Sequence, residues 1–270
     1  SVELYFAPFS DEESGGVLIV LHDVTEQRKT EERRKEFVAN VSHELRTPLT
    51  AMRALIEPLR DGLVKTEEQR QQIYDVVLRE TMRLSRLVND MLELSRLQSG
   101  TASLSRSVFA PLPLFNLIHE TYSAYAEDYQ QTFVYDVPED LPSVWGNPDR
   151  TQQVLIVLLD NAFKYTPEGG VVTLSACAEG DVVRVRVRDT GVGIPAADLP
   201  HVFDRFYKVD KSHHSKGTGL GLAIAYEIMK HLGEEMSVTS EPGRGSCFTF
   251  TLHIAQGAAE KTAELPKAPA

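Results

Sequence analysis

The chain of 270 residues is long enough to form two compact units that each bury a core. It is 42% hydrophobic and 25% charged, and no apolar run approaches the ~18 residues that a membrane-spanning helix needs. The formal net charge of −11 argues against nucleic acid as a general partner, because phosphate binding calls for a basic surface. Cys177 and Cys247 are too few for a disulfide framework or a thiolate metal site, which favours a reducing, cytoplasmic compartment.

Residues 1–24 contain two short runs typical of β-strands, Val2–Phe6 and Val17–His22, with a polar turn between them. A two-stranded hairpin alone is only marginally stable in water, so we expect the end of a larger sheet. The runs resemble the last strands of a PAS sensor domain, and His22–Thr25 resembles the motif that joins such domains to signalling helices. A disordered leader is the alternative. The resemblance implies the cytoplasmic portion of a bacterial membrane receptor, with the membrane segments outside this chain.

Two long amphipathic helices are predicted over residues 25–100. Asp23 or Thr25 can cap the first, which should end near Asp61-Gly62, and the second should begin near Thr66. The helices form an antiparallel hairpin, and one hairpin cannot cover both apolar stripes, so we expect a homodimer with a four-helix bundle. The stripes comprise Phe37, Val41, Leu45, Leu49, Met52, Leu55, Ile56 and Leu59, then Ile73, Val77, Leu84, Leu87, Met91, Leu94 and Leu97.

The first helix carries polar residues within the segment Phe37–Thr50. His43 lies away from the apolar stripe and should face water. Glu44 can orient one ring nitrogen and leave the other available as a nucleophile, while Thr47 adds a hydroxyl one turn later. Pro48 should bend or loosen the helix beside them. A solvated surface histidine is the alternative, but the segment resembles, without a gap, the phospho-accepting box of two-component sensor histidine kinases.

After Gln98-Ser99-Gly100 the pattern changes to mixed helices and strands, which predicts a sheet with helices on one face. Helices are expected near 112–129, 148–165 and 219–232, and an extended segment over 143–145. Strands are expected over 132–136, 171–178, 181–189, 235–240 and 247–254. The fold class is therefore α+β, a dimeric helical bundle followed by an α/β sandwich. We expect a PAS-like remnant over 1–24, the hairpin over 25–100, an ATP-binding domain over 101–255 and a disordered tail over 256–270.

The end of the helix near 148–165 holds the first of four segments suited to a nucleotide. Asn161 offers a neutral oxygen of the kind that Mg²⁺ prefers. Lys164 supplies positive charge for phosphates, and Tyr165 can pack on an adenine ring. If it stood alone, this segment would be read as an exposed helix face.

Three further segments follow in order: Asp189–Ile194, Phe203–Lys208 and Lys216–Leu222. The last opens a helix, where bare backbone N–H groups and the positive end of the dipole favour phosphate. This order resembles the Bergerat-type ATP-binding domain of histidine kinases, and the resemblance assigns Asp189 to the adenine amino group. It also implies nucleotide contacts from Gly191, Gly193, Ile194, Phe203, Arg205, Lys208, Gly217, Thr218, Gly219, Leu220 and Gly221. An ordinary surface role is the alternative for Lys208.

The chain is identified as a member of the sensor histidine kinases, in the WalK/PhoR-like group. The resemblance implies autophosphorylation of His43 from Mg-ATP, with Glu44 accepting the proton, and transfer to an aspartate in the receiver domain of a response regulator. It also implies a phosphatase activity toward that regulator, in which Thr47 positions water. The alternatives are an ATP-binding scaffold or phosphatase-dominant pseudokinase, and an ATPase of the chaperone or DNA-repair kind.

Two places depart from the family pattern. Val157 stands where a second Asn is usual, four residues before Asn161, so Mg²⁺ binding or turnover should be weakened. The lid between Asp210 and Gly217 is shorter than expected and contains His213 and His214, which suggest either a metal site or simply a polar loop. We expect Gly243–Ser246 to be a structural turn.

Overall fold

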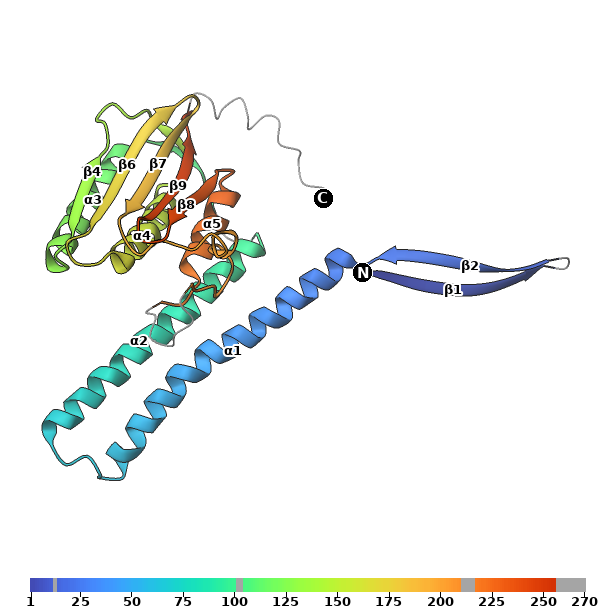
Figure 1. The fold of residues 1–270 in the computed structure, drawn as a ribbon, viewed down its shortest axis with the longest axis horizontal. Coiled ribbons are helices and arrows are strands. Elements are labelled where there is room, and N and C mark those ends of the chain that lie inside the picture. Colours follow the sequence, from blue (N-terminus) through green and yellow to red (C-terminus); the bar gives the residue numbers. More distant parts are fainter. Residues whose placement is uncertain (12–13, 101–103, 210–216, 256–270) are drawn as a thin grey trace. The chain divides into compact units, whose positions relative to one another are not determined.

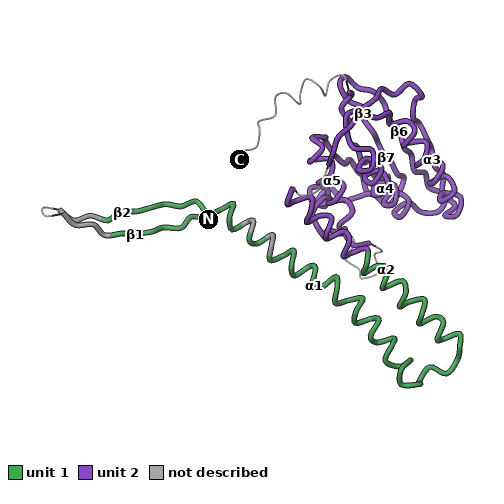
Figure 2. The backbone as a smooth tube through the Cα atoms, turned by 180° about the vertical axis from the view of Figure 1, so that it is seen from behind, with its two compact units in different colours: residues 1–85 green, residues 86–270 purple. Residues whose placement is uncertain are grey.

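The computed structural model describes residues 1–270 except 12–13, 101–103, 210–216 and 256–270. The expected disordered tail and the lid histidines His213 and His214 therefore lie outside the described residues. The chain separates into two compact units, residues 1–85 and 86–270. Figure 2 colours these units and shows that helix α2 crosses the boundary between them.

The N-terminal strands are β1 (Val2–Asp11) and β2 (Ser14–Asp23), paired antiparallel. They lie where strands were predicted and extend further toward the turn. Neighbouring side chains on a strand point to opposite faces, and both Tyr5 and Phe6 are more than half exposed, at 56% and 63%. Apolar side chains are therefore exposed on both faces of this two-stranded hairpin.

Helix α1 (Thr25–Arg60) and helix α2 (Glu67–Gln98) form the hairpin that the sequence predicts (Figure 1). The predicted cap by Asp23 or Thr25 is wrong, because Val24 is the N-cap of α1 and no side chain among the described residues caps the helix. The carboxylate of Asp23 accepts instead from the backbone N–H of Thr25, the first residue of α1, at 2.9 Å. Helix α1 is assigned without a break through Pro48, which is buried. Among the described residues, no helix combines the length and the apolar character needed to cross a membrane.

A second apolar stripe on each helix of the hairpin is left exposed. At about 100° per residue, the members on α1 fall within about 20° of one another and those on α2 within about 120°. They are Val38, Leu49 and Ile56 on α1, and Tyr74, Leu78, Met82, Val88 and Leu92 on α2. Only Leu49 and Ile56 of these belong to the predicted stripes. The hairpin therefore has an inner seam and a second apolar face that stays exposed among the described residues.

The second unit contains a five-stranded sheet in the order β4-β6-β7-β9-β8, parallel between β4 and β6 and otherwise antiparallel (Figure 1). Its strands are β4 (Thr132–Asp136), β6 (Val171–Glu179), β7 (Val182–Asp189), β8 (Met236–Glu241) and β9 (Gly245–His253). Its helices are α3 (Pro111–Asp128), α4 (Pro148–Tyr165) and α5 (Gly221–His231). The predicted elements are confirmed to within about two residues at each end.

Two short elements were not predicted. Strand β3 (Ser107–Phe109) pairs antiparallel with β5 (Val144–Gly146), and a 3₁₀ turn, η1, covers Leu199–His201. Three residues are too few to show a hydrophobic period, so neither β3 nor η1 leaves a readable pattern in the sequence.

The core of this unit lies on one face of the sheet. Alternate residues of β6, β7 and β9 are buried, as are one face each of α3, α4 and α5. Phe163 of α4 is central, with Tyr122 of α3 stacked on it at 5.5 Å and Phe133 of β4 edge-on at 5.5 Å. This one-sided burial confirms the predicted sandwich of a sheet with helices on one face.

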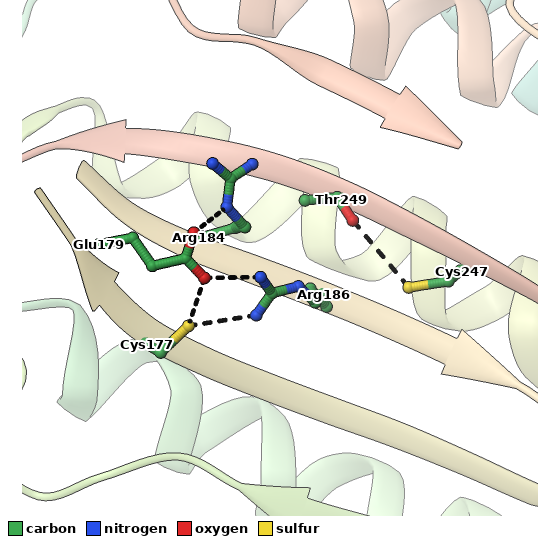
Figure 3. Close-up of polar contacts among 6 residues, drawn as sticks. All are labelled: Cys177, Glu179, Arg184, Arg186, Cys247 and Thr249. Atoms are coloured by element: carbon green, nitrogen blue, oxygen red, sulfur yellow. Dashed lines mark hydrogen bonds and ion pairs between the residues drawn. The ribbon is translucent and has the colours of Figure 1, made fainter. Parts of the chain in front are cut away.

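The other face of the sheet is polar (Figure 3). Glu179 of β6 accepts from Arg184 and Arg186 of β7, each at 2.6 Å, and lies 3.1 Å from the thiol of Cys177. The two arginines lower the pKa of Glu179 to about 2. Cys247 lies on β9, beyond β7, and both cysteines are free thiols. The ion pairs of Glu179 with Arg184 and Arg186 give this face a charged, partly exposed surface.

Candidate active site

The predicted acceptor residues lie on α1 as expected from the helical spacing. His43 is exposed, and the hydroxyl of Thr47 donates to the His43 carbonyl at 3.1 Å. Glu44 is half-buried and accepts from Arg83 of α2 at 3.4 Å, while Arg83 also lies 3.7 Å from Glu80. Arg83 was not predicted, because sequence spacing cannot show which charge of α2 faces Glu44 across the hairpin. The contact ties the carboxylate next to His43 to the second helix.

Helix α4 begins with a cap that the sequence encodes. The Asn147 side chain accepts from the Arg150 N–H at 2.9 Å, and Pro148 occupies the first turn. At the other end, Asn161 Nδ2 donates to the Val157 carbonyl at 2.8 Å, which leaves Oδ1 as the atom that could face a ligand. The start of α4 is thus set by capping, and its last turns present Asn161 with a defined orientation.

Lys164 and Tyr165 interact with each other at the end of α4. The Lys164 Nζ donates to the Tyr165 hydroxyl at 2.8 Å and lies 4.3 Å from the centre of the ring. The same ammonium lies 3.2 Å from the point where a Cβ on Gly217 would stand. The structure therefore brings the end of α4 to the glycine-rich segment that precedes α5.

Asp189 ends β7 and is 4% exposed. Its Oδ1 accepts from the backbone N–H of Gly191 at 2.8 Å and of Ser246 at 3.2 Å. Within the described residues both hydrogen bonds end on Oδ1, which leaves Oδ2 to accept from a ligand. Burial raises the pKa of Asp189, against the opposing effect of the two N–H donors.

Close backbone contacts explain two of the glycines around Asp189. A Cβ on Gly191 would stand 2.3 Å from the Tyr165 carbonyl oxygen, so the loop after β7 can approach the end of α4 only with glycine there. A Cβ on Gly245 would stand 2.0 Å from the Asp189 carbonyl oxygen. The turn at Gly243–Ser246, expected to be structural, is thus the element that places the Ser246 N–H on Asp189.

Ser240 of β8 holds the other end of the Asp189–Ile194 loop. Its hydroxyl accepts from the Ile194 N–H at 2.8 Å and donates to the Gly245 carbonyl at 2.8 Å. Gly193 approaches the backbone of Glu241, where a Cβ would stand 2.2 Å from the carbonyl oxygen. Ser240 and Ser246 were missed because their contacts join segments about 50 residues apart in sequence.

The segment Phe203–Lys208 divides into packing and loop residues. Phe203 stacks on Tyr226 of α5 at 5.0 Å and meets Phe248 of β9 edge-on at 6.3 Å, so it packs against the core. Arg205 is exposed and Lys208 is half-buried. These ring contacts give Phe203 a structural position against α5 and β9.

The segment Gly219–Gly221, before and at the start of α5, makes three contacts with its surroundings: a backbone hydrogen bond, a buried side chain and a close approach to α4. The Gly219 carbonyl accepts from the Phe206 N–H at 2.8 Å, and Phe206 adopts a positive φ of 62°. Leu220 is fully buried, so only its backbone can meet a ligand. Gly221 begins α5, and a Cβ there would stand 3.3 Å from a methyl group of Val157. Val157 therefore fills space beside the N-terminus of α5.

Thr218 has a partner that was not predicted. Its hydroxyl donates to the Asp90 carboxylate of α2 at 2.9 Å.

Among the described residues, no cluster of three or more His, Cys, Asp or Glu side chains could hold a metal ion. A magnesium ion here would take one amide oxygen, that of Asn161, and would need phosphate and water oxygens for its other positions, which is how Mg²⁺ is commonly bound.

Two families match the chain in succession. The "His Kinase A (phospho-acceptor) domain" matches residues 33–100, and the "Histidine kinase-, DNA gyrase B-, and HSP90-like ATPase" family matches residues 146–256. The sensor histidine kinase WalK of Bacillus subtilis (strain 168) is 42% identical over 241 residues, which cover 88% of this chain. The chain spans 39% of the length of that relative.

Two solved histidine kinases share the fold. The complex of histidine kinase ThkA with the response regulator protein TrrA has 25% identity and a TM-score of 0.69, covering 95% of this chain and 79% of ThkA. Full-length ShkA in complex with AMPPNP has 31% identity and a TM-score of 0.61, covering 82% of this chain and 46% of ShkA. The consecutive domain matches, the WalK identity and these folds agree, and the chain is a WalK-like histidine kinase core.

Proposed function

We propose that the chain is an ATP-dependent protein-histidine kinase that phosphorylates its own His43. The observation that carries this proposal is that two sites occur in one chain. His43 is exposed next to Glu44, whose carboxylate is paired with Arg83. The ATP-binding domain brings its loops together with Asp189, Lys164 and the start of α5. A chaperone-type or DNA-repair-type ATPase has no use for the His43 helix. The phospho-acceptor match over residues 33–100 supports the kinase instead.

The proposed nucleotide site uses each segment for a different part of ATP. Asp189 Oδ2 accepts from the adenine amino group, since its Oδ1 is already saturated by two backbone donors. The backbone N–H groups at the start of α5 and the Lys164 ammonium neutralise the phosphates. Asn161 Oδ1 would hold Mg²⁺, which supplies charge neutralisation at the transferring phosphoryl group. The neighbouring ShkA structure contains AMPPNP, which supports a nucleotide at this fold.

The proposed reaction at His43 is an in-line displacement. A ring nitrogen forms a bond to the γ-phosphorus as the bond from that phosphorus to the bridging oxygen of ADP breaks, and ADP leaves with the electron pair. Glu44 orients the ring and accepts its proton. Arg83 is a positioning residue in this scheme, because it limits the orientations of the Glu44 carboxylate. The phosphoryl group then passes to a receiver-domain aspartate.

Two macromolecular partners follow from the proposal. The uncovered stripes of α1 and α2 fit a second copy of the hairpin, which gives the homodimeric four-helix bundle expected from the sequence. A response regulator is the second partner, as in the ThkA–TrrA complex. We also propose a phosphatase activity toward that regulator, in which the Thr47 hydroxyl and Glu44 position the attacking water.

The surroundings of the chain are part of the same proposal. The β1–β2 hairpin, open on both faces, fits the end of a PAS-like sheet over residues 1–24. The hairpin domain then covers 25–100 and the ATP-binding domain 101–255. We propose that the chain is the cytoplasmic portion of a bacterial membrane receptor and that its membrane contact lies in other segments.

A phosphatase-dominant scaffold is the second candidate, and one observation favours it. Val157, where the family usually has Asn, lies against Gly221 at the N-terminus of α5 with a hydrocarbon side chain. No second amide is therefore available one turn before Asn161 to help hold a metal. A weak or absent kinase activity with nucleotide binding retained would be the mark of this scaffold.

The test is incubation with γ-labelled ATP and Mg²⁺, using wild type, His43→Gln and Val157→Asn. The kinase predicts acid-labile, alkali-stable label on wild type, none on His43→Gln, and more on Val157→Asn because the missing amide is restored. Nucleotide binding should be equal in wild type and His43→Gln. Label that persists on His43→Gln would refute the assignment of the acceptor, and unlabelled but nucleotide-binding wild type would favour the scaffold.

A further inference from the structure

The last turns of α2 carry two acidic residues that bind the ATP-binding domain at two separate places. Asp90 accepts from Thr218 at 2.9 Å. Glu93 forms an ion pair with Arg150 and accepts from Gln153 at 2.8 Å, both on the first turns of α4. Because Asp90 and Glu93 are three residues apart, they lie on one face of α2. All of these residues belong to the second compact unit, 86–270.

Asp90 competes with a nucleotide for the same donor. The Thr218 hydroxyl has a single proton, and while it donates to Asp90 it cannot donate to a phosphate oxygen. Thr218 also precedes the start of α5, where backbone N–H groups and the helix dipole favour an anion. The Asp90 carboxylate, held by Thr218, brings a negative charge close to this helix start. The half-buried position of Asp90 raises the pKa of its carboxyl, against the effect of Thr218, so this contact is made at a desolvation cost.

Glu93 makes its contacts far from the place where the proposed site would hold the phosphates of a nucleotide. Arg150 and Asn161 are eleven residues apart on α4, which corresponds to about 16 Å along the helix axis. Arg150 also donates to Gln153 at 2.7 Å, so Glu93, Arg150 and Gln153 form a closed polar network. This network is too remote to touch a nucleotide, and it can influence nucleotide binding only by holding α2 against the domain.

We propose that Asp90 and Glu93 form a latch that holds the last turns of α2 on the ATP-binding domain and is opened by the phosphates of a bound nucleotide. The proposal rests on the proposed nucleotide site and adds its regulation. Linkage requires reciprocity: if phosphates displace Asp90, then the closed latch weakens nucleotide binding by the same factor. Loss of either latch residue should therefore tighten the binding of a nucleotide with phosphates.

The experiment compares AMPPNP and adenosine binding by calorimetry to wild type, Asp90→Ala, Glu93→Ala and the control Asp75→Ala. Asp75 is an exposed aspartate of the same helix with no assigned role. A latch that is closed about 90% of the time predicts about tenfold tighter AMPPNP binding in Asp90→Ala. We expect about threefold in Glu93→Ala, where the Thr218 contact remains. Adenosine binding should be equal in all four proteins, since adenosine has no phosphate to displace Asp90.

The Glu93→Ala variant separates a latch from simple repulsion. If Asp90→Ala tightens AMPPNP binding and Glu93→Ala does not, Asp90 only repels phosphate and the latch is refuted. Equal AMPPNP affinities in all four proteins refute it as well. Amide hydrogen exchange measures the opposite direction of the coupling, the effect of the nucleotide on the latch. AMPPNP, but not adenosine, should speed exchange over residues 86–98 of wild type. Failure of all four proteins to bind AMPPNP would instead refute the proposed nucleotide site, and the latch with it.

Discussion

The helical hairpin and the ATP-binding domain bury their apolar residues in different ways. In the domain, one face of the sheet and three helices enclose Phe115, Phe163 and Phe250, all at most 2% exposed. In the hairpin, the inner seam is only partly buried and a second stripe, including Leu78 at 60% exposure, is open. The domain thus carries a complete core within one chain, whereas the hairpin needs a second hairpin to complete its own.

The chemistry of the two regions differs in the same way. The nucleotide residues are drawn from five elements and depend on backbone contacts such as Ser246 to Asp189. The acceptor residues His43, Glu44 and Thr47 follow one another on a single helix, and Arg83 of α2 reaches Glu44 across the hairpin. Damage to packing should therefore affect the nucleotide site strongly and the acceptor helix weakly. Four predictions test this difference.

The largest expected effect is on the core of the domain. Phe163→Ala removes a ring that packs against Tyr122 and Phe133, and the cavity should lower the free energy of unfolding by about 3–5 kcal/mol. Denaturant unfolding of the ATP-binding domain should show this loss independently of protein concentration. Phe6, which is 63% exposed in the β1–β2 hairpin outside this domain, offers the matched Phe→Ala control. A loss that depends on concentration would mean that this core also needs a second copy.

The hairpin should respond to concentration instead. Leu78→Lys places a charge in the uncovered stripe of both copies and should weaken the dimer by about 3 kcal/mol, or roughly 150-fold. Sedimentation over a range of concentrations measures the change, and Arg79→Lys, one position on and already charged, is the control. An unchanged dimer would show that a different surface joins the copies, and the contrast between the two regions would then be lost.

A smaller effect, about 2 kcal/mol or roughly thirtyfold, is expected on nucleotide binding by Asp189→Asn, because an amide offers a donor where the adenine amino group needs an acceptor. The same substitution should raise the thermal stability of the domain at neutral pH. Burial raises the pKa of Asp189 in the folded domain. Protonation of Asp189 therefore stabilises the folded domain fully when the pH is below the unfolded-state pKa of about 4. This stabilisation is lost as the pH rises through the raised pKa of the folded state.

The Asp189→Asn protein should therefore melt at a higher temperature than wild type at pH 7, and the difference should shrink toward pH 3. Thermal melts at several pH values check this, and Asp136→Asn at the exposed end of β4 is the control. A lower melting temperature at pH 7 would show that the two N–H donors to the carboxylate outweigh its burial.

The smallest effect is expected at Thr47. Its hydroxyl donates to the His43 carbonyl on the same helix, and Thr47→Ala should leave the fold and nucleotide binding intact. Dephosphorylation of the regulator should fall about fivefold while autophosphorylation changes about twofold or less, as expected for loss of one hydrogen bond of about 1 kcal/mol. Thr47→Ser, which retains the hydroxyl, should behave as wild type. Equal losses of the two activities would count against a separate role in dephosphorylation.

Much of the architecture could be predicted from the sequence, because it depends on short-range periodicity. Seams at spacings of three and four predicted both long helices, and alternation predicted the strands of the sheet. The position of His43 on an exposed face follows from the same helical period. Short elements such as β3 were missed because three residues carry no period.

The amino-acid sequence by itself determined the elements, their order, and the residue types available to a nucleotide and a phosphoryl group. Only the tertiary structure decided which distant groups meet. It placed Ser246 on Asp189, Arg83 on Glu44, Asp90 on Thr218 and Val157 against Gly221. These contacts join residues tens of positions apart, and their energies depend on burial and distance in three dimensions, which a local pattern does not contain.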